Sequence, residues 1–224
     1  IATTRWLTFY RTALKRGSRW EGLLGVVVHD HWKPYYTLTG VLHALCNAHH
    51  LRELKALVEI DKEPWAQRMQ RLLRRACHAV NLAQGRGEPL PPRLVARFQR
   101  QYDAIAADGL AFHEALPPLP WRGKRGRPRR RPGHNLLRRL TQRRDDVLRF
   151  LTDPRVPFTN NLAEQAARMM KLRQKISGGF RTEPSACDFA VIRSVIVTAK
   201  KQGWSVIHTL TQPSARLIAQ LRTD

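Results

Sequence analysis

Residues 23–30 read Leu-Leu-Gly-Val-Val-Val-His-Asp, an apolar and β-branched run that stops abruptly at two polar residues. This pattern is typical of a buried strand that delivers a polar side chain at its carboxyl end. A second apolar run, residues 41–46, ends in the same way before Asn47. We therefore expect Asp30 at the edge of a sheet, where functional sites are common. An ordinary strand-end or turn aspartate fits this residue equally well.

From His49 the pattern becomes helical and stays so for about a hundred residues. Apolar side chains recur at spacings of three and four, first over residues 65–83 and then over 94–105. A proline-rich break at 116–120 precedes a further helix expected over about 136–151. The two strands and these helices predict an α/β chain that is predominantly helical, with a large helical insertion.

Residues 122–133 are rich in Gly, Pro and Arg and contain no acid. Such a segment cannot bury apolar surface, so we expect a flexible loop. Arg125, Arg127 and Arg129 also resemble the core of an AT-hook, which lays arginines into a narrow A·T minor groove. General attraction to phosphate is the simpler interpretation of this loop.

Residues 157–171 place one carboxylate at the start of a helix that is otherwise cationic. This carboxylate and three basic side chains after it are spaced by four, three and four residues, which puts all four on one helical face. They are Glu164, Arg168, Lys171 and Lys175. The structural alternative is a capping box, with Asn161 as the N-cap and Glu164 three positions later.

The composition is strongly basic, with 40 Lys plus Arg against 17 Asp plus Glu and a formal net charge of +23. A polyanion is the expected partner. Hydrophobic residues make up 42% of the 224 residues, enough for a core, which excludes a merely disordered basic tail. No apolar run suits a membrane span or a signal peptide, and the three cysteines are odd in number and widely spaced. We therefore expect an intracellular protein with reduced thiols and no membrane partner.

Asp30 and Glu164 are the candidate catalytic and metal-binding acids. Carboxylate oxygens are the ligands that Mg²⁺ prefers, and two such ions can promote cleavage and joining of a DNA phosphodiester. Basic side chains near these acids would hold phosphates. The expected DNA-binding residues in this part of the chain are Arg168, Lys171, Arg173, Lys175 and Arg181.

A zinc site is the alternative suggested by His43, Cys46, His49 and His50. Zinc usually takes four ligands from paired motifs, and no second Cys or His pair occurs at a convincing spacing. We therefore do not expect zinc. For His49, a histidine packed at a helix start is the structural alternative to a role in the site.

Four motifs resemble the prokaryotic transposases of the insertion-sequence 66 group, in matching order over about residues 23–205. The motifs are residues 29–32, 45–54, 159–164 and 173–181. The resemblance implies DNA strand cleavage and transfer during transposition, by an RNase H-like domain with an Asp-Asp-Glu triad that uses Mg²⁺ or Mn²⁺. Asp30 falls on the second Asp and Glu164 on the final Glu. His49, in a C-x-x-H step, would contact the scissile phosphate or orient site groups.

The resemblance also implies an organisation of the chain. It comprises an atypical N-terminal segment 1–22, a partial RNase H-like core 23–47, a helical insertion 48–152, catalytic-core helices 153–205 and a C-terminal tail 206–224. The family's first catalytic Asp lies on an earlier strand, and residues 1–22 contain no Asp. We therefore interpret the sequence as an N-terminally truncated transposase that does not cut DNA unaided.

The partner implied is double-stranded DNA, as transposon ends and target, bound by a homo-oligomer in the nucleoid of a prokaryotic cytoplasm. Two other functions fit the same sequence. One is a non-catalytic, basic DNA-binding remnant that uses no metal. The other is a metal-dependent RNase H-like nuclease that acts on RNA.

Overall fold

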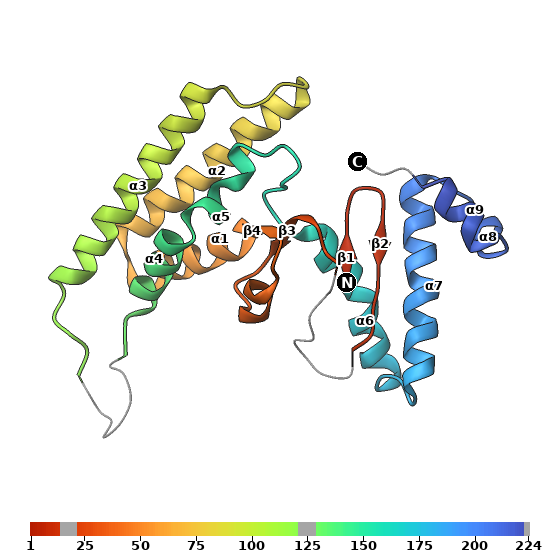
Figure 1. The fold of residues 1–224 in the computed structure, drawn as a ribbon. Helices are drawn as coiled ribbons and strands as arrows, with labels where there is room; N and C mark the ends of the chain where they lie inside the picture. Colours follow the sequence, from red (N-terminus) through yellow and green to blue (C-terminus); the bar gives the residue numbers. More distant parts are fainter. Residues whose placement is uncertain (14–21, 121–128, 222–224) are drawn as a thin grey trace. The chain divides into compact units, whose positions relative to one another are not determined.

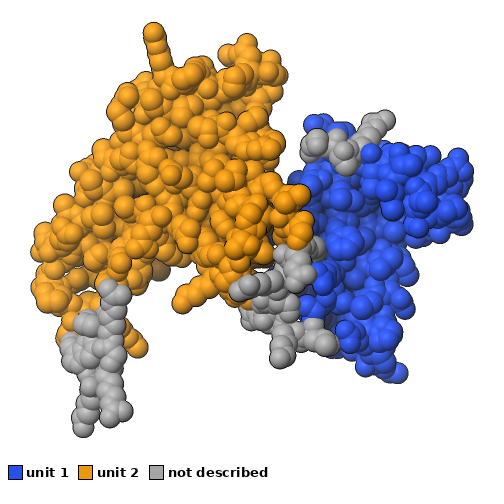
Figure 2. Space-filling model, viewed as in Figure 1, with its two compact units in different colours: residues 1–18, 161–224 blue, residues 19–160 orange. Residues whose placement is uncertain are grey.

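The computed structural model describes residues 1–13, 22–120 and 129–221 (Figure 1). The chain divides into two compact units (Figure 2). Unit 1 comprises residues 1–18 and 161–224, and unit 2 comprises residues 19–160. All of unit 2 therefore lies between the two segments of unit 1 in chain order.

Unit 2 begins with a parallel pair of strands, β3 (Gly25–His29) and β4 (Val41–Leu45). The 3-10 helix η1 (Lys33–Thr37) lies in the connection between them. The register aligns His29 with Leu45, and the Cys46 N–H continues the ladder by donating to the His29 carbonyl at 2.9 Å. Both predicted strands are confirmed, and their carboxyl ends meet at one edge of the sheet.

The helices of unit 2 bear out the predicted helical region. They are α1 (Asn47–Ala56), the π-helical turn η2 (Leu57–Asp61), α2 (Pro64–Gly85), α3 (Pro92–Ala115), α4 (Pro132–Gln142), α5 (Arg144–Leu148) and the 3-10 turn η3 (Arg149–Leu151). Helices α2, α3 and α4 each carry a proline in the first turn, where the missing N–H has no intrahelical partner to lose.

The core of unit 2 is formed where α2 packs against α1 and α3, and α3 against α4 (Figure 1). Trp65 and Leu73 on α2, Tyr102 on α3 and Leu137 on α4 are at most 1% exposed. Burying an aliphatic or aromatic side chain of this size stabilises the fold by about 1.5–3 kcal/mol. The apolar stripes seen in the sequence are therefore core, as expected.

The single helix predicted over 136–151 is wrong. Helix α4 ends at Gln142, and Arg143 adopts φ −116° and ψ 28° before α5 begins. The Arg143 guanidinium lies over the Tyr36 ring, with Cζ 4.0 Å from the ring centroid. The break lets α5 pack against β4 and bury Val147 and Leu148. Apolar spacing continues through Arg143, so the pattern contains no sign of the break.

Unit 1 contains a short antiparallel hairpin and helices. Its elements are β1 (Ala2–Thr3), β2 (Thr8–Phe9), α6 (Asn161–Ser177), α7 (Glu183–Gln202), α8 (Val206–Leu210) and α9 (Ser214–Ala219). Helix α7 ends at Gly203, whose φ of 75° suits the left-handed C-cap position. The described residues thus form two separate two-stranded sheets, one in each unit.

The hairpin is held to α7 by side-chain hydroxyls. The Thr8 N–H donates to Thr198 Oγ1 at 3.2 Å, and the Tyr10 N–H donates to Ser194 Oγ at 2.9 Å. The Tyr10 hydroxyl donates to the Ala166 carbonyl of α6 at 2.8 Å. The first ten residues, which show no period in the sequence, therefore gain their structure from partners that are 156 to 190 residues away in the chain.

The capping-box interpretation of α6 stays a prediction. Asn161 is the first helical residue rather than the residue before it. Glu164 is the fourth residue of α6 as it is bounded here. The acid still lies in the first turn, where the helix dipole favours a negative charge.

Within the described residues, no helix combines the length and the apolar character needed to cross a membrane.

Glu63 is a buried acid at the junction of α2, α3 and α4. Its Oε2 accepts a hydrogen bond from Trp65 Nε1 at 2.7 Å and lies 3.2 Å from His113 Nε2. Burial raises the pKa of Glu63 and lowers the pKa of His113. A methyl group on Gly133, in the first turn of α4, would lie 2.6 Å from Glu63 Oε1 and closer to Oε2.

We predict that Gly133→Ala lowers the free energy of unfolding by about 1–3 kcal/mol, because the added methyl group overlaps a carboxylate fixed by Trp65. Urea unfolding followed by far-ultraviolet circular dichroism measures the change. Gly85→Ala is the control, since no atom lies within 4 Å of its new methyl group. It should leave stability unchanged or slightly raised. Equal unfolding midpoints for Gly133→Ala and the parent chain would contradict the prediction.

Candidate functional site

Asp30 follows β3 directly and is half-buried at the carboxyl edge of the β3–β4 pair. Its Oδ1 accepts the Trp32 N–H at 3.0 Å, the short-range bond of an Asx turn. Its Oδ2 has no hydrogen-bond partner among the described residues. The turn reading of this aspartate is therefore correct, but the turn uses only one oxygen and leaves the other for a ligand.

His29 and His43 form a hydrogen-bonded pair on neighbouring strands. His29 Nδ1 contacts the Asp30 carbonyl, which can only accept, so Nδ1 carries the proton. Burial lowers the pKa of His29 and keeps it neutral, so its Nε2 accepts from His43 Nδ1–H at 2.9 Å. The proton positions of both rings follow from this single carbonyl.

Asn47 fixes the direction of a second set of hydrogen bonds. Its Nδ2 donates to the Val147 carbonyl of α5 at 3.0 Å, which leaves Oδ1 to accept from His50 Nδ1–H at 3.0 Å. Its backbone N–H donates to the Phe158 carbonyl at 3.0 Å. The buried Asn47 side chain therefore joins the start of α1 to α5. The backbone N–H of the same residue bonds the segment before α6.

From His50 the hydrogen bonds continue back to the residue after Asp30. His50 Nδ1 carries the proton, so its Nε2 accepts from His31 Nε2–H at 2.9 Å. His31 Nδ1 then accepts from the Tyr36 hydroxyl at 2.9 Å. Donors therefore point in one direction, from Tyr36 through His31 and His50 to Asn47. We call these four residues the relay.

Burial sets the charge state of the relay. It lowers the pKa of His50 to about 3, helped by His31 and Arg139. It lowers the pKa of His31 to about 4, with the Arg139 charge as the next cause. Burial also raises the pKa of Tyr36. All three ionisable groups of the relay are therefore neutral near pH 7, as the hydrogen-bond directions require.

Charged residues from α5 and η3 support the strand end. Arg149 Nε donates to the His43 carbonyl at 2.7 Å, and its Nη2 lies 3.2 Å from Asp146 Oδ1. Asp146 also approaches Arg143 Nη1 at 3.6 Å. This acid is thus matched by two arginines, one of which stacks on Tyr36 of the relay.

Cys46 is buried at the end of β4, where its Sγ accepts the Asn160 N–H at 3.1 Å. His49 lies half-buried in the first turn of α1, with its N–H bonded to the Cys46 carbonyl at 3.2 Å. The C-x-x-H step therefore spans the strand end and the helix start. The role of His49 in catalysis stays a prediction.

The remaining predicted site residues belong to both units of the chain. Glu164 lies on α6 in unit 1, whereas Asp30 and His49 belong to unit 2. The predicted DNA-binding residues of unit 1 are all exposed, namely Arg168, Lys171, Arg173, Lys175 and Arg181. Arg129 of unit 2 is exposed as well, and Arg125 and Arg127 lie outside the described residues.

Asn47, His31 and Tyr36 are site residues that were not predicted from the sequence. The available signal was the density of polar, hydrogen-bonding residues just after each predicted strand, over residues 29–31 and 46–50. Nothing in the order of residues indicates that His31 pairs with His50, because the partners come from different elements.

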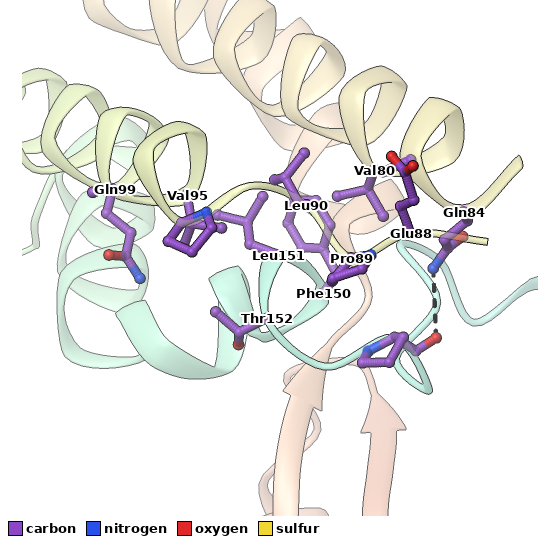
Figure 3. Close-up of a pocket in the computed structure, with 14 residues that line it drawn as sticks. Val80, Gln84, Glu88, Pro89, Leu90, Val95, Gln99, Phe150, Leu151 and Thr152 are labelled. Atoms are coloured by element: carbon purple, nitrogen blue, oxygen red, sulfur yellow. Dashed lines mark hydrogen bonds between the residues drawn. The ribbon is translucent and has the colours of Figure 1, made fainter. Parts of the chain in front are cut away.

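A separate hollow in unit 2 is mainly apolar (Figure 3). It has a volume of about 290 Å³ and lies between the end of α2, the start of α3 and η3. Val80, Leu90, Val95 and Phe150 line it, and Gln84 Nε2 donates across its rim to the Pro154 carbonyl at 3.4 Å. Of its lining residues only Glu88 ionises, so it is a poor place for phosphoryl chemistry.

We predict that the chain loses stability as pH falls below 6.5. The unfolded state takes up protons near the ordinary histidine pKa of 6.5, whereas buried His50 resists protonation until about 3. Stability from this group is therefore present above pH 6.5 and declines as pH falls toward 3, by up to about 1.4 kcal/mol per pH unit. Urea midpoints measured at several pH values test this.

His50→Gln should be less stable at pH 7 but should lose less stability on acidification than the parent chain. The matched control is His78→Gln, which replaces an exposed histidine of α2. If the parent chain and His50→Gln show the same pH dependence, the proposed neutral state of the relay is wrong.

Comparison with known proteins identifies the family of this chain. The family model described as Transposase IS66 family matches residues 3–187. The chain is also similar to the uncharacterized protein y4jO of Sinorhizobium fredii (strain NBRC 101917 / NGR234), at 26% identity over 120 residues. That match covers 54% of this chain and 32% of the relative, so the chain matches about a third of the relative's length. No solved structure matches the chain. Because the family match covers most of the chain, including Asp30, His49 and Glu164, the chain belongs to the IS66 family of transposases.

Proposed function

We propose that this chain supplies two carboxylates, Asp30 and Glu164, to the metal-dependent cleavage and transfer of DNA strands in the transposition of an insertion sequence. The observation that carries the proposal is Asp30. It stands at the carboxyl end of a parallel strand, with one oxygen outside its turn, in a chain of a transposase family.

Asp30 fits a divalent metal ion because it offers a hard oxygen ligand. Glu164 follows Asn160 by four residues along the chain, and the Asn160 N–H is itself bonded to Cys46 at the strand end. We therefore propose Asp30 and Glu164 as ligands of Mg²⁺ or Mn²⁺. Such an ion would activate a water or a 3′-hydroxyl and stabilise the leaving oxygen. His49, in the same region of unit 2, would contact the phosphate that is cut.

An RNase H-like arrangement is part of the proposal. Its support is the parallel pairing of β3 with β4 and the position of the helices of residues 48–152 between the two acids in the chain. Residues 153–205 would then carry the catalytic-core helices, and a homo-oligomer would assemble on DNA.

A three-carboxylate site needs one acid more than Asp30 and Glu164. Residues 1–29, which precede the strand-end aspartate, contain no Asp. We therefore expect residues 1–224 by themselves to bind DNA and a metal ion without cutting the DNA. If they cut it, another acid of this chain completes the site.

We predict that Asp30→Asn and Glu164→Gln each weaken Mn²⁺ binding to the chain by about tenfold or more, because each removes an ionised ligand. Electron paramagnetic resonance of free Mn²⁺ gives the dissociation constants. If both acids hold the same ion, the two losses should couple, so that the loss in the double variant differs from the sum of the two single losses.

Glu59→Gln and Glu183→Gln are the controls for the metal experiment. The first removes an acid from η2 and the second removes an acid from the start of α7, and neither residue belongs to the proposed site. Both should bind Mn²⁺ like the parent chain. Additive effects of Asp30→Asn and Glu164→Gln would show that the two acids do not share an ion.

We also predict that duplex DNA binds through the cationic face of α6. The logarithm of the binding constant should fall linearly with the logarithm of salt concentration, by about 0.9 for each phosphate neutralised. Replacing Lys171 and Lys175 by Gln should make this slope shallower by about 1.8 if each contacts one phosphate. Lys55→Gln with Arg155→Gln is the charge-matched control, because both residues are ion-paired. A flat salt response of the parent chain would exclude DNA as the partner.

A further inference from the structure

We propose that the α2–α3 hairpin of unit 2 carries a second surface for the DNA backbone, formed by Arg71, Arg75 and Arg97. This inference rests on the proposed function, because it takes duplex DNA as the partner. It concerns a part of the chain that contains neither Asp30 nor Glu164, and it names residues outside the basic loop and α6.

The outer face of α2 is cationic over residues 68–78. The helix contains no Asp or Glu, and its basic side chains are spaced so that they point away from the core. The core face carries Trp65, Met69 and Leu73, all at most 1% exposed. The exposed basic residues of α2 are Arg68, Arg71, Arg74, Arg75 and His78.

Ion pairs neutralise only part of this face. Arg68 Nη1 lies 2.8 Å from Asp108 Oδ2 on α3. The other aspartate of α3, Asp103, is taken by Arg144, at 2.6 Å from its Nε. Arg71, Arg75 and Arg97 are exposed and form no ion pair with any described residue.

The Arg68–Asp108 pair defines one side of the hairpin, on which the two helices run in opposite directions side by side (Figure 1). Arg75 is 75 − 68 = 7 residues beyond Arg68, about two turns, and so faces the same side. Arg97 is 108 − 97 = 11 residues before Asp108, about three turns, and also faces that side.

The same arithmetic places these arginines in a row. At about 1.5 Å per residue, Arg71, Arg75 and Arg97 lie roughly 4.5, 10.5 and 16.5 Å from the level of the ion pair, all in the same direction. The row therefore has a charge about every 6 Å and rests on helices with a rigid packed core. Duplex DNA presents phosphates every 3.4 Å per strand along its axis, so such a row can meet several of them.

A solvated cationic face is the ordinary alternative, but the hairpin has an unusual charge balance. Like charges three and four residues apart on a helix repel each other by about 0.2–0.5 kcal/mol per pair. Arginine is also the side chain best suited to hydrogen-bond phosphate oxygens in pairs. A phosphate backbone removes the repulsion and uses these donors, without any reading of base sequence.

The test compares the parent chain with the triple variant Arg71→Gln, Arg75→Gln and Arg97→Gln by fluorescence anisotropy with a labelled DNA duplex over a range of salt concentrations. The slope of log K against log salt should become shallower by about 2.7, since three phosphate contacts are lost. The control variant is Arg68→Gln, Arg144→Gln and Arg155→Gln, which removes the same charge from residues that are ion-paired. It should change the slope much less.

A third variant, Arg71→Lys, Arg75→Lys and Arg97→Lys, keeps the charge and guards against misfolding. It should retain the slope of the parent chain. An unchanged slope in the Gln variant, or equal losses in the Gln variant and the ion-pair control, would overturn the inference while leaving the proposed function standing. A parent chain that binds no duplex at any salt concentration would overturn DNA binding itself.

Discussion

The buried amide of Asn47 is the interaction on which the strand-end region depends. It donates to α5, accepts from His50, and its own backbone N–H holds the segment before α6. An amide buried this deeply must have its hydrogen bonds made, because each unmet one costs about 1–3 kcal/mol. The three partners of Asn47 are thus required to stay together, and His31, the residue after Asp30, acquires a fixed neighbour in His50 as a result.

The histidines near Asp30 are compatible with an acid at the strand end because of their charge state. Burial lowers the pKa values of His29, His31 and His50, so these three histidines add hydrogen bonds without adding positive charge around Asp30. Asp146 lies 3.6 Å from Arg143 Nη1 and 3.2 Å from Arg149 Nη2 and so offsets one of these two nearby positive charges. A carboxylate in such surroundings keeps its affinity for a cation, which charged histidines would reduce.

The sequence predicts what is local in this chain and misses what joins distant segments. Apolar runs identified both strands, and the apolar stripes identified α2 and α3, because each pattern is written within a single element. The break at Arg143 was missed, since it depends on Tyr36 more than a hundred residues earlier. The β1–β2 hairpin and the relay were missed for the same reason. Of the candidate site, Asp30 could be placed from its strand alone, whereas its neighbours could not.

Composition constrains where DNA can bind. Even if all 17 acids were paired, 40 − 17 = 23 of the basic residues would have no acidic partner. Unpaired cations must therefore cover part of the surface, and their positions are set by where the acids are used. In unit 2, Asp146 is ion-paired beside the strand end and Asp103 and Asp108 are ion-paired on α3, and α2 has no acid at all. Helix α6 is nearly as poor in acids, because Glu164 is its sole acid and lies at its start. Both helices thus collect uncompensated charge in separate units, and a polyanion that neutralises them would stabilise each unit independently.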